Sequence, residues 1–138
     1  MVVTSTILGE GPIYRIAREG ALAQCSIVNS AEVTAAVGAR CAIEMRDLLT
    51  ARVLTHGAEY RGLVFDVRLG PLAFGPRTRA ALEPIFAAAR MSDRRIAVVV
   101  NESPTQLMQF TTLGREFAPK QAQVFRDPDA ARAWVLER

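Results

Sequence analysis

Hydrophobic and polar positions form blocks along this chain, and the blocks predict strands and helices in turn. Short apolar runs typical of strands occur at residues 12–18, 21–28, 63–67, 95–101 and 121–126. Between them, apolar residues recur every three or four positions, which is typical of amphipathic helices. These helices are expected at residues 30–54, 77–90, 104–117 and 127–137. Asn29 followed by Glu32 is the signature of a capping box before the first helix.

The order of the predicted elements is β-β-α-β-α-β-α-β-α. Strands that alternate with helices indicate a largely parallel sheet covered by helices. The first two strands meet at Glu19-Gly20 and predict an antiparallel hairpin, so we expect an α/β fold with a single mixed β-sheet flanked by helices. Right-handed crossovers place the helices on both faces, or mostly on one face if the strand order winds one way. Residues 1–11 are expected to form a loose N-terminal arm.

The run RIAVVVN at residues 95–101 predicts a strand in the interior of the sheet, because it is continuously apolar and rich in β-branched residues. Both faces of this strand are expected to be buried. One face carries Ile96, Val98 and Val100, and the other carries Ala97 and Val99.

Length and composition favour one soluble domain spanning residues 1–138. Half of the residues are hydrophobic and 22% are charged, which suits a chain that buries a core without a metal or disulfide. No apolar run approaches the roughly 18 residues of a membrane span, and the N-terminus lacks the features of a secretory signal. We therefore expect a cytoplasmic protein with no membrane partner. Cys25 and Cys41 fit neither a disulfide framework nor a metal pair and are expected to be buried thiols.

The net charge of +3 comes from arginines that are interleaved with acids along the chain. This is the pattern of solvated helix faces and gives no basic stripe, so we expect no nucleic-acid partner. His56 is the only histidine, no serine lies in a nucleophile elbow, and no metal-ligand spacing is present. We expect a protein that is not an enzyme and that holds no metal or cofactor.

The segment between the strand at 63–67 and the next helix has the glycine spacing of a phosphate-binding loop, at Gly70 and Gly75. A Walker A loop needs Lys and then Ser or Thr after its second glycine. Here Pro76 and Arg77 follow, and Pro76 has no N–H to offer a phosphate. We therefore reject a nucleotide site. Asp66, inside the strand, is expected to bond backbone or an arginine rather than to perform catalysis.

Three stretches together resemble a STAS domain, the module of sulfate transporters and anti-sigma-factor antagonists. They are YRGLVFDVRLGPLAFGPRTRAALEPIFAAAR, RRIAVVVN and QAQVFRDPDAARAWV. The shared features are a strand of the form x-V-x-D-V before a loop and a helix, a second apolar strand, and a closing F-x-D-x-x-x-A. This last motif falls on Phe125, Asp127 and Ala131. The resemblance spans residues 12–136 and fits best the group that stands alone in bacteria.

The resemblance implies a non-enzymatic protein-interaction module of bacterial signalling. In that family the loop after the strand and the helix that follows dock on a kinase-like or regulator partner. This places the contact at Phe74, Pro76, Arg77, Thr78 and Arg79. Anti-sigma-factor antagonists carry a phosphorylatable Ser after an Asp at the start of this helix, and this chain has no such pair. Thr78 is the one hydroxyl within reach, so it is a candidate for phosphorylation, although we favour a role in capping or packing.

The opening hairpin and the arm leave an exposed edge in the predicted sheet. Exposed edges are commonly paired or covered. We therefore expect a homodimer.

A second hypothesis is a binder of a small apolar or acyl ligand. The lipid-transfer (CRAL-TRIO) fold shares this layering, and residues 106–117 include an apolar set that also fits ordinary core packing. This set is Leu107, Met108, Phe110 and Leu113. An empty apolar cavity above about 300 Å³ beneath this set would favour the ligand. A filled core with an exposed patch at Phe74 would favour the protein partner.

Overall fold

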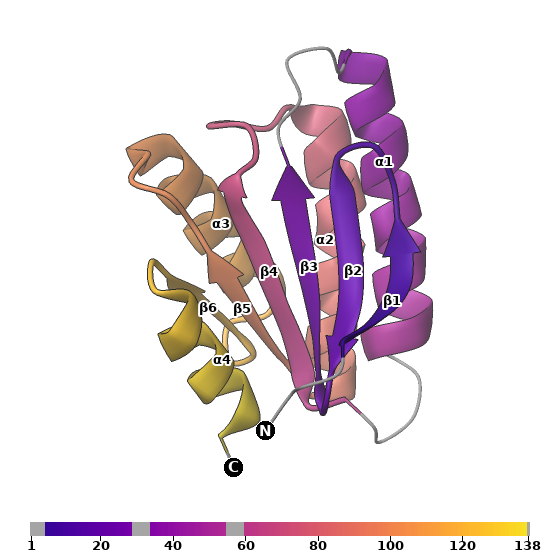
Figure 1. The fold of residues 1–138 in the computed structure, drawn as a ribbon. Coiled ribbons are helices and arrows are strands. Elements are labelled where there is room, and N and C mark those ends of the chain that lie inside the picture. The colour runs from indigo at the N-terminus through magenta and orange to yellow at the C-terminus, as the bar shows by residue number, and fades with distance from the viewer. Residues whose placement is uncertain (1–4, 29–33, 55–59, 138) are drawn as a thin grey trace.

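The computed structural model describes residues 5–28, 34–54 and 60–137, and Figure 1 shows the fold that they form. These residues form six strands, four α-helices and one π-helix. In chain order the elements are β1 (Ser5–Glu10), β2 (Tyr14–Glu19), β3 (Leu22–Val28), α1 (Ala35–Leu48), the π-helix η1 (Leu49–Leu54), β4 (Gly62–Leu69), α2 (Pro76–Ser92), β5 (Arg95–Val99), α3 (Pro104–Phe117), β6 (Ala122–Phe125) and α4 (Pro128–Leu136).

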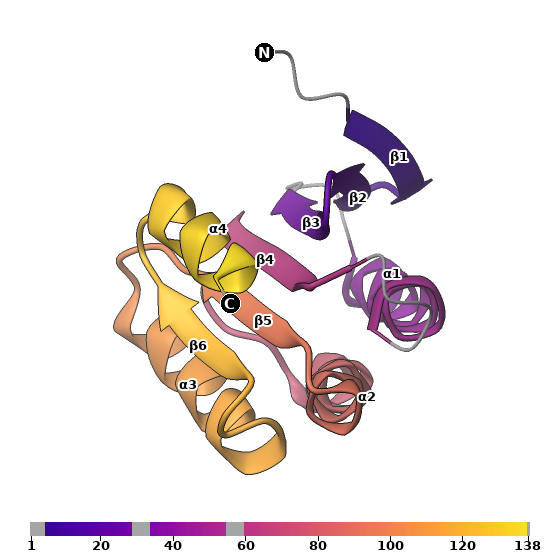
Figure 2. The same cartoon turned by 90° about the horizontal axis from the view of Figure 1, so that it is seen from below.

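The strands form one mixed sheet in the order β1-β2-β3-β4-β5-β6, which confirms the predicted α/β class. β1, β2 and β3 pair antiparallel, and β3, β4, β5 and β6 pair parallel. The parallel strands follow one another in a single direction, so right-handed crossovers place α1, α2 and α3 on the same face. Figure 2 shows these three helices on one face of the sheet and α4 on the other.

The prediction of a loose arm over residues 1–11 is wrong for its described part. Ser5–Glu10 is an edge strand that pairs antiparallel with β2, with a bulge between Ile7 and Gly9. Leu8 packs against the core, which gives the strand its attachment. The sequence signal was weak because Ile7 and Leu8 are adjacent rather than alternating, and because Gly9 resembles the start of a turn.

Strand β5 is buried on both faces, as predicted from its continuous apolar run. Ile96, Val98 and Val100 belong to the main core, which lies beneath α1, α2 and α3. Ala97 and Val99 belong to a smaller core beneath α4. The five side chains are at most 1% exposed, so the chain is shielded from water from Ile96 to Val100.

Helix α1 begins at Ala35, where Thr34 acts as the N-cap and its hydroxyl accepts a hydrogen bond from the N–H of Val37 at 3.2 Å. The predicted capping box, Asn29 with Glu32, lies outside the described residues. After Leu48 the chain continues in the π-helix η1, which buries three apolar side chains. The helical stretch therefore reaches residue 54, as predicted, and changes from an α-helix to a π-helix after Leu48.

Cys25 and Cys41 are free thiols in the core, as expected. The sulfur of Cys25 lies 3.7 Å from the sulfur of Met45. Burial raises the pKa of both thiols above the ordinary value, so they remain protonated in the folded chain. Among the helices that the structure describes, none has the length and apolar character to cross a membrane.

Candidate functional site

The loop between β4 and α2 is held by two glutamines of α3. Gln109 brackets Phe74: its side-chain oxygen accepts from the Phe74 N–H at 2.9 Å, and its amide nitrogen donates to the Phe74 carbonyl at 3.0 Å. Gln106 is buried, and its amide nitrogen donates to the carbonyls of Val67 at 2.8 Å and Pro71 at 3.1 Å. Because the glutamines are three residues apart, they share one face of α3 and together fix the backbone of the loop.

Two backbone N–H groups of this loop, which has the glycine spacing of a phosphate-binding loop, form hydrogen bonds within the protein. The N–H of Phe74 is taken by Gln109, and the N–H of Gly70 donates to the carbonyl of Val67 at 3.0 Å. A phosphate cradle would need such N–H groups to point at an anion. The N–H groups of Phe74 and Gly70 are therefore already engaged within the protein.

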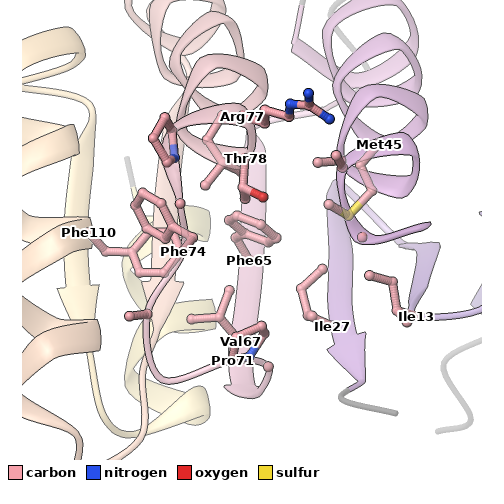
Figure 3. A pocket seen from close by; sticks show the side chains of 18 of the residues that line it. Ile13, Ile27, Met45, Phe65, Val67, Pro71, Phe74, Arg77, Thr78 and Phe110 are labelled. Atoms are coloured by element: carbon pink, nitrogen blue, oxygen red, sulfur yellow. The ribbon is translucent and has the colours of Figure 1, made fainter. Parts of the chain in front are cut away.

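A cavity of about 670 Å³ lies between α1 and α2, where β3 and β4 reach their carboxyl ends. In open α/β sheets this edge is the usual place for a ligand. Figure 3 shows Phe65 and Val67 of β4 beside Ile27 of β3, with Ile13 farther along the same side. Phe110 of α3 adds a second ring to the lining. The walls are therefore built from segments that are distant in the sequence.

The space exists because the residues that α1 turns toward it are small. Gly38, Ala39 and Ala42 line the cavity, and Met45 is the one large side chain that α1 adds to the described lining. A Cβ added at Gly38 would meet no heavy atom within 4 Å, and the same holds at Gly75 on the opposite wall. Small side chains on both walls therefore leave the space between the two helices unfilled at this end of the sheet.

The residues predicted for a partner contact divide into two groups. Phe74, Pro76, Arg77 and Thr78 line the cavity. Arg79 does not belong to the lining residues that the structure describes; instead its guanidinium pairs with two carboxylates. These are Glu83 at 3.0 Å and Glu116 at 2.6 Å. The hydrogen bond to Glu83 raises the pKa of Arg79 further, so this arginine is a fixed cation that joins α2 to Glu116 of α3.

Phe74 does not form an exposed patch. Its side chain is half-buried, and its ring meets that of Phe110 edge to face with the centroids 5.2 Å apart. Phe110 in turn meets Phe65 at 5.9 Å, again edge to face. Such pairs are favourable beyond their buried area. Phe74 is thus joined through two other rings to the sheet, and one side of it forms part of the cavity wall.

Two polar side chains stand at the start of α2. Gly75 is the N-cap and offers no side-chain hydrogen bond, and Pro76 occupies the first turn. Thr78 is half-buried, and Figure 3 shows it next to the ring of Phe65. The guanidinium of Arg77 extends from α2 toward α1 in the same view. The largely apolar cavity therefore has a hydroxyl and a cation on its α2 wall, and Thr34, the N-cap of α1, adds a second hydroxyl to the lining.

Asp66 bonds an arginine, as predicted. It accepts hydrogen bonds from the guanidinium of Arg68 at 2.8 and 3.0 Å and from the Arg68 N–H at 3.1 Å. The bond to Asp66 raises the pKa of Arg68. Nowhere in residues 5–28, 34–54 and 60–137 do three His, Cys, Asp or Glu side chains gather closely enough to hold a metal ion.

Several residues of the cavity were not identified from the sequence. Ile13 was assigned only to a strand, and Met45 only to the helix at residues 30–54. The small residues Gly38, Ala39 and Ala42 on one face of α1 were the available signal, since small side chains in a helix that faces a sheet leave space. Gln106 and Gln109 carried no recognisable motif.

Comparisons of the chain with protein-family models, with curated proteins and with solved structures found no match.

Proposed function

We propose that this protein binds a small apolar ligand, of the acyl-chain type, in the cavity between α1 and α2. The observation that carries the proposal is the cavity itself. Its volume of about 670 Å³ lies within the range of roughly 300–1,000 Å³ that small-molecule sites occupy. The half-buried position of Phe74 also favours a ligand over a protein partner. A docking loop was expected to expose Phe74 as part of an apolar patch.

Binding without catalysis fits the chemistry of the walls. The lining residues that the structure describes include no carboxylate, imidazole or thiol. General acid–base and nucleophilic catalysis depend mainly on such groups. We therefore propose a carrier or sensor of its ligand that is not an enzyme.

The test uses a neutral apolar dye, N-phenyl-1-naphthylamine, which fluoresces when it leaves water. The delipidated protein should bind the dye with saturable enhancement. Gly38→Leu places a large side chain in the open space on the α1 wall and should reduce dye affinity at least tenfold, while improving helix propensity. Ala36→Leu is the matched control, since Ala36 is exposed on the same helix. Wild-type protein that gives no saturable signal would contradict the proposal.

A second candidate, a STAS-like interaction module in the bacterial cytoplasm, is favoured by a different observation. Leu69 and Leu72 at the end of β4 are 68% and 62% exposed, and Val28, which pairs with Leu69, is 47% exposed. Grouped exposed apolar residues are typical of interaction sites. A kinase-like or regulator partner that docks here should be lost with Leu69→Ser plus Leu72→Ser and retained with Gly38→Leu. A partner that binds both variants equally would place the interface elsewhere.

A further inference from the structure

We propose that the occupant of the cavity is an aliphatic monocarboxylate, a fatty-acid anion, whose carboxylate pairs with Arg77 while its chain fills the apolar space. This inference rests on the proposed function and names the chemistry of its ligand. Arg77 is the only charged residue among those described around the cavity. A cavity with apolar walls and one cation is complementary to an apolar molecule with one negative charge.

The cation is available for such a ligand. Within the parts of the chain that the structure describes, Arg77 makes no salt bridge, whereas Arg79, two residues later, is held by Glu83 and Glu116. A guanidinium presents its N–H donors in the fork geometry that matches a carboxylate. The side chain of Arg77 is exposed, so a carboxylate at this rim keeps contact with water and avoids the desolvation cost of a fully buried pair.

The start of α2 adds donors on the same wall. The first N–H groups of a helix have no partner within the helix, and Gly75 supplies no side-chain cap. The Thr78 hydroxyl lies on this wall as well. These groups only support the pairing, because the inference is carried by the charge of Arg77 beside the large apolar space.

The single cation also favours a particular head group on the ligand. A carboxylate carries one negative charge, which Arg77 balances. A phosphate monoester carries about 1.5 to 2 negative charges at neutral pH and would leave part of its charge unmatched among the described lining residues. The chain of the ligand would then lie against apolar lining residues such as Phe65, Ile27 and Met45.

The experiment measures displacement of N-phenyl-1-naphthylamine by dodecanoate and by 1-dodecanol, which share a chain and differ in the head group. Arg77→Gln should weaken dodecanoate by up to about fivefold, the effect of losing an ion pair that stays in contact with water, and leave dodecanol unchanged. Arg79→Gln is the control and should change neither. From octanoate to dodecanoate, affinity should rise up to about fourfold per methylene while the added carbons are buried.

The outcomes separate this inference from the proposed function. If the dye and dodecanol bind but dodecanoate is unaffected by Arg77→Gln, the head-group assignment is overturned and the apolar site remains. If the dye, dodecanol and dodecanoate all fail to bind wild-type protein, the proposed function falls and the assignment falls with it. Thermal unfolding of both arginine variants checks that they fold, as expected for exposed or partly exposed positions.

Discussion

Replacement of Gln106 by leucine tests how the loop beside the cavity is held. Gln106 is 1% exposed, and leucine fills a similar volume, so the substitution removes polar contacts with little change in packing. Three contacts are lost. The amide nitrogen no longer donates to the carbonyls of Val67 and Pro71, and the side-chain oxygen no longer accepts from the N–H of Asn101 at 2.8 Å.

The expected loss of stability depends on whether each group that bonded Gln106 finds another hydrogen-bond partner. The Val67 carbonyl still accepts from the N–H of Gly70, and Pro71 is an exposed residue whose carbonyl can turn to water. The N–H of Asn101 belongs to a half-buried residue. Each lost hydrogen bond should therefore lower the free energy of unfolding by about 1 kcal/mol, which is less than the full penalty for an unsatisfied buried group. The three bonds together lower it by about 3 kcal/mol. For a domain of this size that lowers Tm by roughly 10 °C.

Urea unfolding followed by circular dichroism measures this change. Gln123→Leu is the control, because Gln123 is an exposed glutamine on β6, and it should stay within about 0.5 kcal/mol of wild type. Because Gln106 positions the loop that carries Phe74, Gln106→Leu should also weaken dye binding. A Gln106→Leu protein as stable as the control would refute the reasoning that these bonds hold the loop.

Three further predictions concern the core and its ionisable groups. Val98→Asp should unfold the chain, because an unpaired charge in a fully buried strand costs several kcal/mol; a soluble variant with unchanged Tm would contradict the placement of β5. Phe74→Ala should cost about 2 kcal/mol in urea unfolding, less than the 3–5 kcal/mol of a fully buried phenylalanine, and unchanged stability would mean that its ring is not packed. Burial raises the pKa of Tyr14 to about 12 and also raises those of Cys25 and Cys41. Stability should therefore be complete below about pH 9 and fall as the pH rises further, because the unfolded chain then loses protons that the folded chain keeps, with a slope of up to about 1.4 kcal/mol per pH unit for each group. Equal unfolding free energies at about pH 8 and about pH 10 would contradict this.

The parts of the fold that follow local pattern could be predicted. The continuous apolar run of β5 identified a doubly buried strand, and Ser103-Pro104 placed the start of α3, where the Ser103 hydroxyl caps the helix. Strand β1 could not be predicted from its own residues, because pairing with β2 and the contact of Leu8 with the core stabilise it.

The cavity depends on distances between elements that no local pattern encodes. Predicting it would require knowing that Gly38 and Ala42 of α1 border a space whose lining also includes Gly75 at the start of α2. The resemblance-based assignment of the loop directed attention to Phe74 and Arg77, which do border this space, while assigning them to a protein contact. The binding experiments with dodecanoate and with a protein partner distinguish these two roles.

The methionines offer the most direct test that a ligand enters this cavity. Met45 lines it and is 4% exposed, whereas Met91 and Met108 are 87% and 62% exposed and are not among the described lining residues. With ¹³C-labelled methionine methyl groups, titration with dodecanoate should shift the Met45 signal and leave those of Met91 and Met108 nearly unchanged, and Gly38→Leu should suppress the shift. A Met45 signal that stays in place while dodecanoate binds would contradict the account.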